Sequence, residues 1–366
     1  MFKNHYKNKK VLITGHTGFK GSWLTAWLLE CGANVVGVSI DIPSNPSMFE
    51  VLELNSKTKN YFEDVRDLDK LSNIINAEQP DYIFHLAAQA IVSISKINPI
   101  ETMSTNVIGT MNLLEVLRNY SRECVVVFIT SDKCYDNVEW VWGYRETDPL
   151  GGKDIYSGSK AAAELVIKSY VNTYFNQNHP VKIGIGRAGN VIGGGDWAKD
   201  RIIVDAILAW SKNEAVSIRA PKSTRPWQHV LEPLSGYLHL GSSLKINPEL
   251  HGEAYNFGPS SEQNKSVKEL ILDISIGWNL SNENIYNLIE SNNFKESKLL
   301  KLNCDKALYD LNWESNLEYQ ETAKSVSEWY REFYLIKSKS MYDFTVNQIN
   351  IYCQRALSRN KIWTKK

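Results

Sequence analysis

The segment Lys10-Val11-Leu12-Ile13-Thr14-Gly15-His16-Thr17-Gly18-Phe19-Lys20-Gly21 decides the fold of this chain. A short β-branched strand leads into three glycines, each separated from the next by two residues, and a helix-forming run follows over 22–31. Such a turn lets the backbone approach a pyrophosphate closely and offers it the free N–H groups of a helix N-terminus. The glycines alone, spaced G-x-x-G-x-x-G, fit an ordinary turn as well, but the flanking strand and helix favour a dinucleotide site.

Strands and helices continue to alternate beyond this segment. Further strands are expected at 34–40, 61–63, 82–86, 125–129 and 182–187, and helices at 68–77, 99–120 and 155–175. This alternation predicts an α/β fold with a Rossmann-type, doubly wound parallel sheet. We expect a dinucleotide-binding domain over 1–188, to which 231–257 return, and a smaller C-terminal substrate-binding domain over 189–366.

Residues at the ends of these strands are candidates for holding a dinucleotide. Asp41 follows the second strand, where an acidic side chain commonly binds the ribose hydroxyls of NAD. A strand ending at Ser39 would leave room for a 2′-phosphate, and Lys20 adds a cation nearby, so NAD is favoured over NADP without NADP being excluded. The other candidates lie in the glycine turn and after the third and fourth strands: Gly15, Thr17, Gly18, Phe19, Gly21, Asp64, Val65, Leu86, Ala87 and Ala88.

Two of these positions have simpler alternatives. Asp64 is placed to accept from an adenine amino group, and this is compatible with the simpler interpretation of a solvated turn before a helix capped by Asp67. His85 lies inside the apolar fourth strand and is expected to be a hydrogen-bonded core histidine rather than a base.

Composition excludes several classes of function. The chain has 41 basic and 41 acidic residues, so no overall charge attracts nucleic acid or an anionic membrane surface. Its five cysteines are odd in number and lack C-x-x-C spacing, so neither a metal site nor a disulfide framework is predicted. Residues 1–10 are basic and polar, and no apolar run approaches membrane-spanning length, so a cytoplasmic protein is expected.

A second informative stretch runs from Thr130 to Lys160. An apolar strand delivers Ser131, Asp132 and Lys133 to its C-terminal end, and the next helix presents Tyr156 and Lys160 one turn apart on one face. Open α/β sheets bind ligands at this edge. Alone, a Tyr-x-x-x-Lys pair would read as a surface feature. Following a glycine turn and a strand-end serine, it indicates an enzyme.

Taken together, these motifs resemble the extended short-chain dehydrogenase/reductases. Several blocks resemble the CDP-glucose 4,6-dehydratase family within that superfamily, namely residues 15–21, 131–137, 140–146, 187–197 and 225–233. The resemblance implies NAD as cofactor, with Asn106, Tyr156 and Lys160 among its contacts. It implies a nucleotide-diphosphate sugar as substrate, held by Gln89, Asn190, Asp200, Arg201, Arg225 and His229. The choice of cytidine as the base rests entirely on this resemblance.

The resemblance also implies a reaction. Tyr156 takes the proton of the C4 hydroxyl, aided by Ser131, and Lys160 with the positive nicotinamide lowers a phenol pKa that is ordinarily about 10. The C4 ketone acidifies the C5 hydrogen, and loss of the C6 hydroxyl as water then needs one acid and one base. Asp132 is expected to protonate the leaving hydroxyl and Lys133 to handle the C5 proton, although these two roles could be exchanged. The product would be CDP-4-keto-6-deoxy-D-glucose, a precursor of deoxysugars such as those of lipopolysaccharide O-antigens.

Alternatives remain open at this point. If Asp132 and Lys133 form only a structural pair, an epimerase or reductase on the same scaffold is expected. A non-catalytic cofactor-binding module is disfavoured because Ser131, Tyr156 and Lys160 are all present. The helices at 99–120 and 155–175 pair subunits in this superfamily, so a homodimer or a higher homo-oligomer is expected.

Overall fold

The computed structural model describes residues 1–260, 262–289 and 299–365. Its main sheet has seven parallel strands in the order β11-β6-β5-β4-β1-β2-β3. These strands are β1 (Lys10–Thr14), β2 (Asn34–Ser39), β3 (Lys59–Phe62), β4 (Tyr82–His85), β5 (Cys124–Ile129), β6 (Val181–Arg187) and β11 (Ala254–Asn256). The predicted doubly wound parallel sheet is confirmed.

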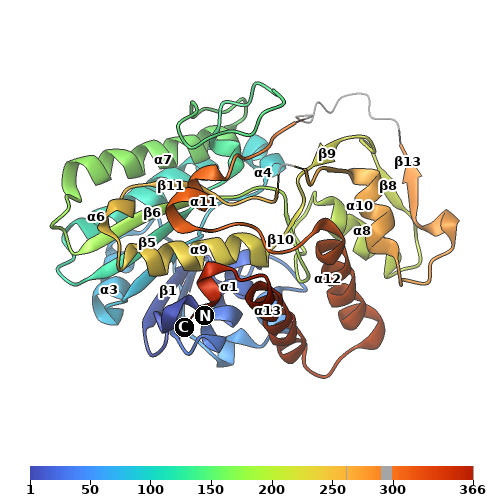
Figure 1. Cartoon of the computed structure of the whole chain (residues 1–366), viewed down its shortest axis with the longest axis horizontal. Coiled ribbons are helices and arrows are strands. Elements are labelled where there is room, and N and C mark those ends of the chain that lie inside the picture. Colours follow the sequence, from blue (N-terminus) through green and yellow to red (C-terminus); the bar gives the residue numbers. More distant parts are fainter. Residues whose placement is uncertain (261, 290–298, 366) are drawn as a thin grey trace.

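Apolar side chains alternate along β1, and each set enters a different core. Leu12 packs in the core beneath α3 (Leu68–Glu78), α6 (Gly109–Arg118) and α7 (Ile155–Tyr174). Val11 and Ile13 pack in the core that includes α1 (Phe19–Glu30) and α9 (Leu231–Leu244). Helices therefore cover both faces of the sheet, as Figure 1 shows, which explains why its central strands read as continuous apolar runs.

The order of the strands reverses between β1 and β4, and the turns that follow these two strands meet there. Gly15 has a φ of +75°, and a Cβ added to it would lie 2.8 Å from the backbone nitrogen of Ala87. Only glycine fits such a left-handed, tightly packed position. The glycine turn and the turn after β4 thus share the crevice in which open α/β sheets bind ligands.

A smaller unit follows β6. Its strands form two-stranded pairs, β7 with β10, β9 with β12 and β8 with β13. Its elements are β7 (Val191–Ile192), α8 (Ile202–Trp210), β8 (Val216–Ile218), β9 (Thr224–Arg225), β10 (Gln228–His229), β12 (Lys265–Ser266), α10 (Val267–Ser275), β13 (Tyr286–Leu288) and α12 (Tyr319–Arg331). Figure 1 shows α8, α10 and β13 on the side of the molecule away from α6.

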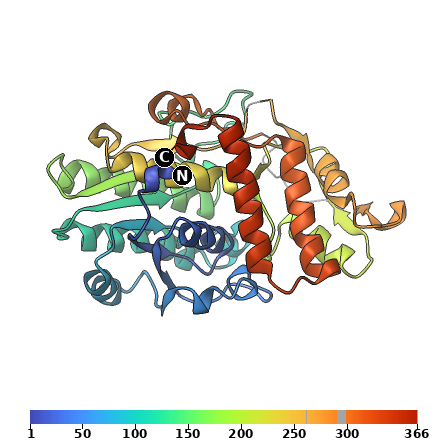
Figure 2. The same ribbon diagram turned by 60° about the horizontal axis from the view of Figure 1, so that its bottom comes forward.

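Two of the C-terminal helices contact elements of the main sheet domain. Helix α13 (Met341–Ser358) packs against α1, and α11 (Asp305–Leu311) packs against β11. Trp363 stacks on Phe2 with ring centroids 5.3 Å apart, so the two termini lie together, as both ribbon views show. Figure 2 shows α12 and α13 side by side. An amphipathic sequence reveals that a helix has a buried face but not which core that face joins.

Short helices connect the main elements. They are α2 (Met48–Val51), α4 (Val92–Ile97) and α5 (Pro99–Met103). The helix expected over 99–120 is interrupted by a π-helical turn, Ser104–Ile108. Across the described parts of the chain, no helix combines the length and the apolar character needed to cross a bilayer.

Candidate active site

The C-terminal end of β5 and the first turns of α7 form the centre of the site. Ser131 caps the short turn Asp132–Cys134 by accepting from the backbone N–H of Lys133 at 3.2 Å. Asp154 caps α7 by accepting from the backbone N–H of Ser157 at 3.0 Å, so the helix begins one residue before Tyr156. The structure brings together four of the predicted catalytic residues, all buried: Ser131, Asp132, Tyr156 and Lys160. Lys133 is half-buried on the same turn.

Burial opposes ionisation of the two α7 side chains. It raises the pKa of Tyr156 to about 12, and a hydrogen bond from Ser131 partly offsets the rise. Burial also lowers the pKa of Lys160 to about 8, although the nearby carboxylate of Glu164 acts to raise that pKa. The phenol of the protein alone therefore keeps its proton, and an added positive charge beside it would ease the loss of that proton.

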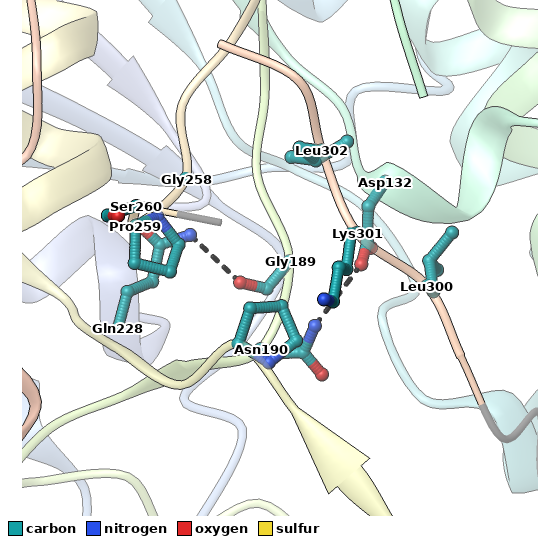
Figure 3. Close-up of a pocket in the computed structure, with 11 residues that line it drawn as sticks. Asp132, Gly189, Asn190, Gln228, Gly258, Pro259, Ser260, Leu300, Lys301 and Leu302 are labelled. Atoms are coloured by element: carbon teal, nitrogen blue, oxygen red, sulfur yellow. Dashed lines mark hydrogen bonds between the residues drawn. The ribbon is translucent and has the colours of Figure 1, made fainter. Parts of the chain in front are cut away.

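The carboxylate of Asp132 faces the segment after β6. It accepts from the Ser131 hydroxyl at 3.0 Å and from the Asn190 amide at 3.4 Å. Gly189 makes this approach possible, because a Cβ there would lie 1.8 Å from Oδ2 of Asp132. Figure 3 shows the contact between Asp132 and Asn190 at the edge of a pocket.

A buried ion pair lies behind the catalytic groups. Arg187 of β6 donates from Nε to both carboxylate oxygens of Glu164, at 2.9 Å each, and both side chains are almost fully buried. Thr130 donates to the same carboxylate at 2.6 Å, and Arg187 also donates to the Tyr135 hydroxyl at 2.6 Å. Since Glu164 is one turn beyond Lys160, this network fixes α7 against β5 and β6.

Replacing Glu164 with Gln should destabilise the protein strongly. The change leaves the Arg187 guanidinium buried without its counter-charge, and breaking a buried pair in this way costs about 3–5 kcal/mol. Denaturant unfolding of the unchanged protein and of Glu164→Gln measures the difference in their free energies of unfolding. Glu328→Gln is the matched control, because its pair with Lys324 is exposed and should contribute less than about 1 kcal/mol. Equal, small losses in both variants would contradict a structural role for the Glu164–Arg187 pair.

The glycine turn is shaped to hold a dinucleotide. A Cβ added to Gly18 would meet only the carbonyl oxygen of Gly15, at 3.4 Å, so backbone is open at the N-terminus of α1. Burial lowers the pKa of Lys20 to about 8, with Arg201 and Lys160 acting in the same direction and Asp132 opposing them. Cationic side chains thus gather beside the half-buried N-terminus of α1, and this combination fits a pyrophosphate.

His16, within the glycine turn, supports this turn rather than acting as a base. Its Nδ1 lies 2.8 Å from the Ser39 hydroxyl and its Nε2 lies 2.9 Å from Oδ1 of Asn60. Burial lowers the pKa of His16 to about 4, so the ring is neutral at physiological pH. Thr17 donates to the backbone carbonyl of Asp41 at 2.7 Å, which fixes the turn to the end of β2.

Two acidic candidates lie at strand ends. The side chain of Asp41 is exposed just beyond β2, which ends at Ser39. Asp64 accepts from the Arg66 side chain at 2.8 Å, while Asp67 caps α3. Partial burial raises the pKa of Asp64, but its hydrogen bonds with Arg66 outweigh burial and leave that pKa lowered.

The turn after β4 is held by Asn106, on the π-helical turn. The Asn106 side chain accepts from the backbone N–H of Gln89 at 2.8 Å and donates to the Ser159 hydroxyl at 2.8 Å. It therefore joins the turn at Leu86–Ala88 to α7 beside Tyr156. His85 is the core histidine expected, because its two ring nitrogens lie 2.8 and 3.3 Å from the hydroxyls of Thr14 and Thr110.

Two of the predicted substrate residues, Gln89 and His229, make their contacts with other residues of the protein. Gln89 uses both ends of its amide on protein partners. It donates to the backbone carbonyl of Ile91 and to the hydroxyl of Thr102 on α5, and it accepts from the backbone N–H of Ile91. His229 is 1% exposed, lies against Trp23 and accepts from the backbone N–H of Leu231 at 3.3 Å. A polar residue in a short strand can point to either side, and the sequence does not reveal which.

Three other predicted substrate residues also have protein contacts. Asp200 accepts a hydrogen bond from the Ser93 hydroxyl. Arg201 forms an ion pair with Asp196 at 2.8 Å. The positive charge of Arg201 also acts to lower the pKa of Tyr156. Arg225 is half-buried in β9 and donates to the backbone carbonyl of Thr224 at 2.9 Å.

A pocket opens beside Asp132 (Figure 3). Its lining comes from five segments of the chain: Asp132, Gly189, Asn190, Pro226, Gln228, Gly258, Pro259, Ser260, Leu300, Lys301 and Leu302. Sequence reasoning missed Gln228 and Lys301 as site residues. Gln228 stands inside the recognised block 225–233, but nothing in its neighbours marks its side chain as facing a pocket. Lys301 lies well beyond residue 233, where the last of these blocks ends.

A family model and two similar proteins of known function are all described as nucleotide-sugar 4,6-dehydratases. The family model described as GDP-mannose 4,6 dehydratase matches residues 12–326. The chain is 45% identical to a CDP-glucose 4,6-dehydratase of Salmonella typhimurium, over 96% of this chain and 98% of that protein. It is 26% identical to a human dTDP-D-glucose 4,6-dehydratase, over 88% of this chain and 90% of that protein.

Solved structures establish the same fold. The epimerase Mth375 of Methanothermobacter thermautotrophicus superposes with a TM-score of 0.78 at 24% identity, covering 93% of this chain and 97% of its own. DesIV, a dTDP-glucose 4,6-dehydratase of Streptomyces venezuelae solved with NAD bound, gives a TM-score of 0.75 at 20% identity, covering 90% of this chain and 100% of its own.

Proposed function

Because this chain belongs to the GDP-mannose 4,6-dehydratase family of extended short-chain dehydrogenase/reductases, we propose that it removes water from a nucleotide-diphosphate glucose. The substrate we propose is CDP-D-glucose and the product CDP-4-keto-6-deoxy-D-glucose. The observation that carries this proposal is the buried group of Ser131, Asp132 and Tyr156, in which an acid lies beside the hydroxyl groups that would handle C4. The 45% identity to the Salmonella enzyme supports cytidine as the base.

The cofactor in this proposal is NAD, which when bound accepts a hydride from C4 and returns it to C6. The glycine turn, the cationic side chains around Lys20 and the turn after β4 are the groups that would hold it. NAD is preferred to NADP because the exposed carboxylate of Asp41, just past β2, would repel a 2′-phosphate. The proposal includes a cytoplasmic location, supported by cysteines that are all free thiols in the described structure.

Each catalytic side chain then has one task. Tyr156 accepts the proton of the C4 hydroxyl, and Ser131 holds that hydroxyl in line. Lys160 keeps positive charge near the phenol and so favours its ionised form. Lys133, as a neutral amine, takes the C5 proton and becomes an ammonium. Asp132, as a protonated carboxylic acid, gives its proton to the departing C6 oxygen and becomes a carboxylate.

Incubation of the purified protein with NAD and a panel of nucleotide-glucoses tests the proposal. We expect the mass of CDP-glucose to fall by one water, without net accumulation of reduced nicotinamide. An epimerase would leave the mass unchanged. If no nucleotide-glucose loses water, the proposed function is wrong.

We also propose that the chain forms a homodimer through α4, α5 and α7, which pack together. Large apolar side chains on these helices are exposed, including Ile97 at 76%, Ile100 at 83% and Leu165 at 54%. An apolar face of this kind is typical of a surface covered by another subunit.

Leu165→Glu should therefore convert the dimer into a monomer, because a charge would be buried at the interface. Light scattering coupled to gel filtration measures the mass. Leu357→Glu is the control, since Leu357 is 61% exposed on α13, away from these helices. An unchanged mass for Leu165→Glu would contradict this interface.

A further inference from the structure

The residue directly after the short turn Asp132–Cys134 is a buried tyrosine whose hydroxyl has two partners. The Tyr135 side chain is 1% exposed. Its hydroxyl accepts from the Arg187 guanidinium at 2.6 Å and lies 2.8 Å from Oδ1 of Asn256. Because a guanidinium can only donate, the hydrogen of the hydroxyl is left to donate to Asn256. The Arg187 guanidinium also lies over the Tyr135 ring, 4.9 Å from its centre, so the side chain has one defined orientation.

Asn256, at the end of β11, is itself held by three further hydrogen bonds. Its Nδ2 donates to the backbone carbonyls of Tyr144 and Asn303, at 2.9 Å each. Its backbone N–H donates to the Glu146 carboxylate at 2.8 Å. Two carbonyl acceptors fix which end of the amide is nitrogen, so Oδ1 is the atom that faces Tyr135. The acceptor of the Tyr135 hydroxyl therefore belongs to a rigid part of the sheet edge.

Lys133 depends on this anchoring. In the described parts of the chain, the contact that holds Lys133 is a backbone one, in which its N–H donates to the Ser131 hydroxyl at 3.2 Å. The backbone N–H of Tyr135 closes the same turn by donating to the carbonyl of Asp132 at 3.4 Å. Asp132 is also held through its carboxylate, but the backbone that carries Lys133 is fixed by Ser131 on one side and by Tyr135 on the other.

Tyr135 also connects this turn to the helix that carries Tyr156. Arg187 donates from Nε to both carboxylate oxygens of Glu164, at 2.9 Å each. Glu164 lies two turns beyond Tyr156 on α7. The series of bonds from Tyr135 through Arg187 to Glu164 therefore fixes the distance between Lys133 and Tyr156, the groups proposed to act at C5 and C4.

We propose that Tyr135 is a positioning residue for the elimination, which holds Lys133 at C5 of a hexose whose C4 hydroxyl faces Tyr156. This inference rests on the proposed dehydration. One bound hexose is served by both groups, first at C4 and then at C5, so their spacing must be fixed before the sugar binds. A misplacement of about 1 Å can slow a reaction by about 100-fold. The proton of C5 still goes to Lys133, and Tyr135 acts through the backbone of that residue.

Tyr135→Phe tests this role, because it removes one hydroxyl and keeps the ring. With CDP-glucose and NAD, we expect water loss to slow by about 10- to 100-fold, since Lys133 is then held less firmly at C5. Oxidation of C4 should change by less than about threefold, so reduced nicotinamide should form at a near-normal rate and persist for longer. Stopped-flow absorbance and mass spectrometry follow the two steps in one sample. The ratio of the two rates does not depend on what fraction of the variant folds.

Tyr352→Phe is the matched control. Tyr352 is also buried, at 2% exposed, and its hydroxyl has two partners, Glu232 at 3.0 Å and Ser235 at 3.2 Å, but it lies on α13. Both variants should lower the denaturant concentration at which the protein unfolds, whereas the ratio of water loss to oxidation should fall only in Tyr135→Phe. An unchanged ratio in Tyr135→Phe would overturn the inference, because the residue would then act only in packing.

A second variant removes the other end of the bond. Asn256→Ala deletes the acceptor and keeps Tyr135, so water loss should again slow more than oxidation. In the double variant, water loss should be slower than in the slower single variant by less than about twofold, because both changes break the same contact. Losses that multiply in full would overturn the inference, since the two residues would then act independently. If the unchanged protein dehydrates no nucleotide-glucose, the proposed function fails as well, whereas normal water loss with an unaltered ratio in Tyr135→Phe removes this inference alone.

Discussion

Tyr156→Phe should lower kcat by about 1,000-fold, because the proton of the C4 hydroxyl then has no acceptor. The phenol is 8% exposed and is hydrogen-bonded to Ser131, so solvent cannot easily replace it as the base. Every later step depends on the C4 ketone. We therefore expect neither transient reduced nicotinamide nor loss of water, which absorbance and mass spectrometry measure separately.

The same variant should still bind its ligands. The change removes one hydroxyl from a ring that otherwise packs as before, so calorimetry should find CDP-glucose affinity changed little. Tyr309→Phe, at a side chain 87% exposed on α11, is the control for loss of a tyrosine hydroxyl. A Tyr156→Phe protein that still oxidises C4 at the normal rate would show that another group is the base.

Lys133→Met should separate the two halves of the reaction. In the proposed reaction, oxidation of C4 uses Tyr156 and Ser131, whereas Lys133 removes the C5 proton and must be a neutral amine to do so. We expect reduced nicotinamide to form and persist while water loss falls by about 100- to 10,000-fold, the range typical of a general base. Stopped-flow absorbance follows the first step and mass spectrometry the second.

Lys153→Met provides the comparison for this variant, because Lys153 is exposed on the segment before α7. It should leave both steps unchanged. If Lys133→Met slows oxidation and water loss equally, Lys133 has no separate role in elimination, and Asp132 becomes the candidate for the C5 base.

Local chemistry explains which parts of the fold could be predicted. Gly15 has a left-handed backbone and lies in close contact with Ala87, and only glycine, which has no Cβ, satisfies both conditions. The strand β5 is buried on both faces, so its apolar run identifies it without any tertiary information. The capping residues Asp67 and Asp154 mark helix starts in the same local way.

Features that depend on distant partners could not be predicted. The ion pair between Glu164 and Arg187 joins α7 to β6, and neither residue stands out in its own segment. The burial of His229 against Trp23 depends on how β10 is rotated over α1. Gln228 carries no local sign that its amide nitrogen is taken by Gly189 and Phe257. The candidate catalytic residues were found because spacing within one strand and one helix sets their positions; their roles stay predictions.

The contact between the two ends of the chain has a consequence for biosynthesis. Trp27 of α1 packs against Tyr352 and Trp363, and Phe2 stacks on the same Trp363. On the ribosome the first helix emerges long before the residues that cover this aromatic side of it. Until Tyr352 and Trp363 have been translated, that side of the helix is open to chaperones or to aggregation, and a chain cut short before α13 would leave it uncovered.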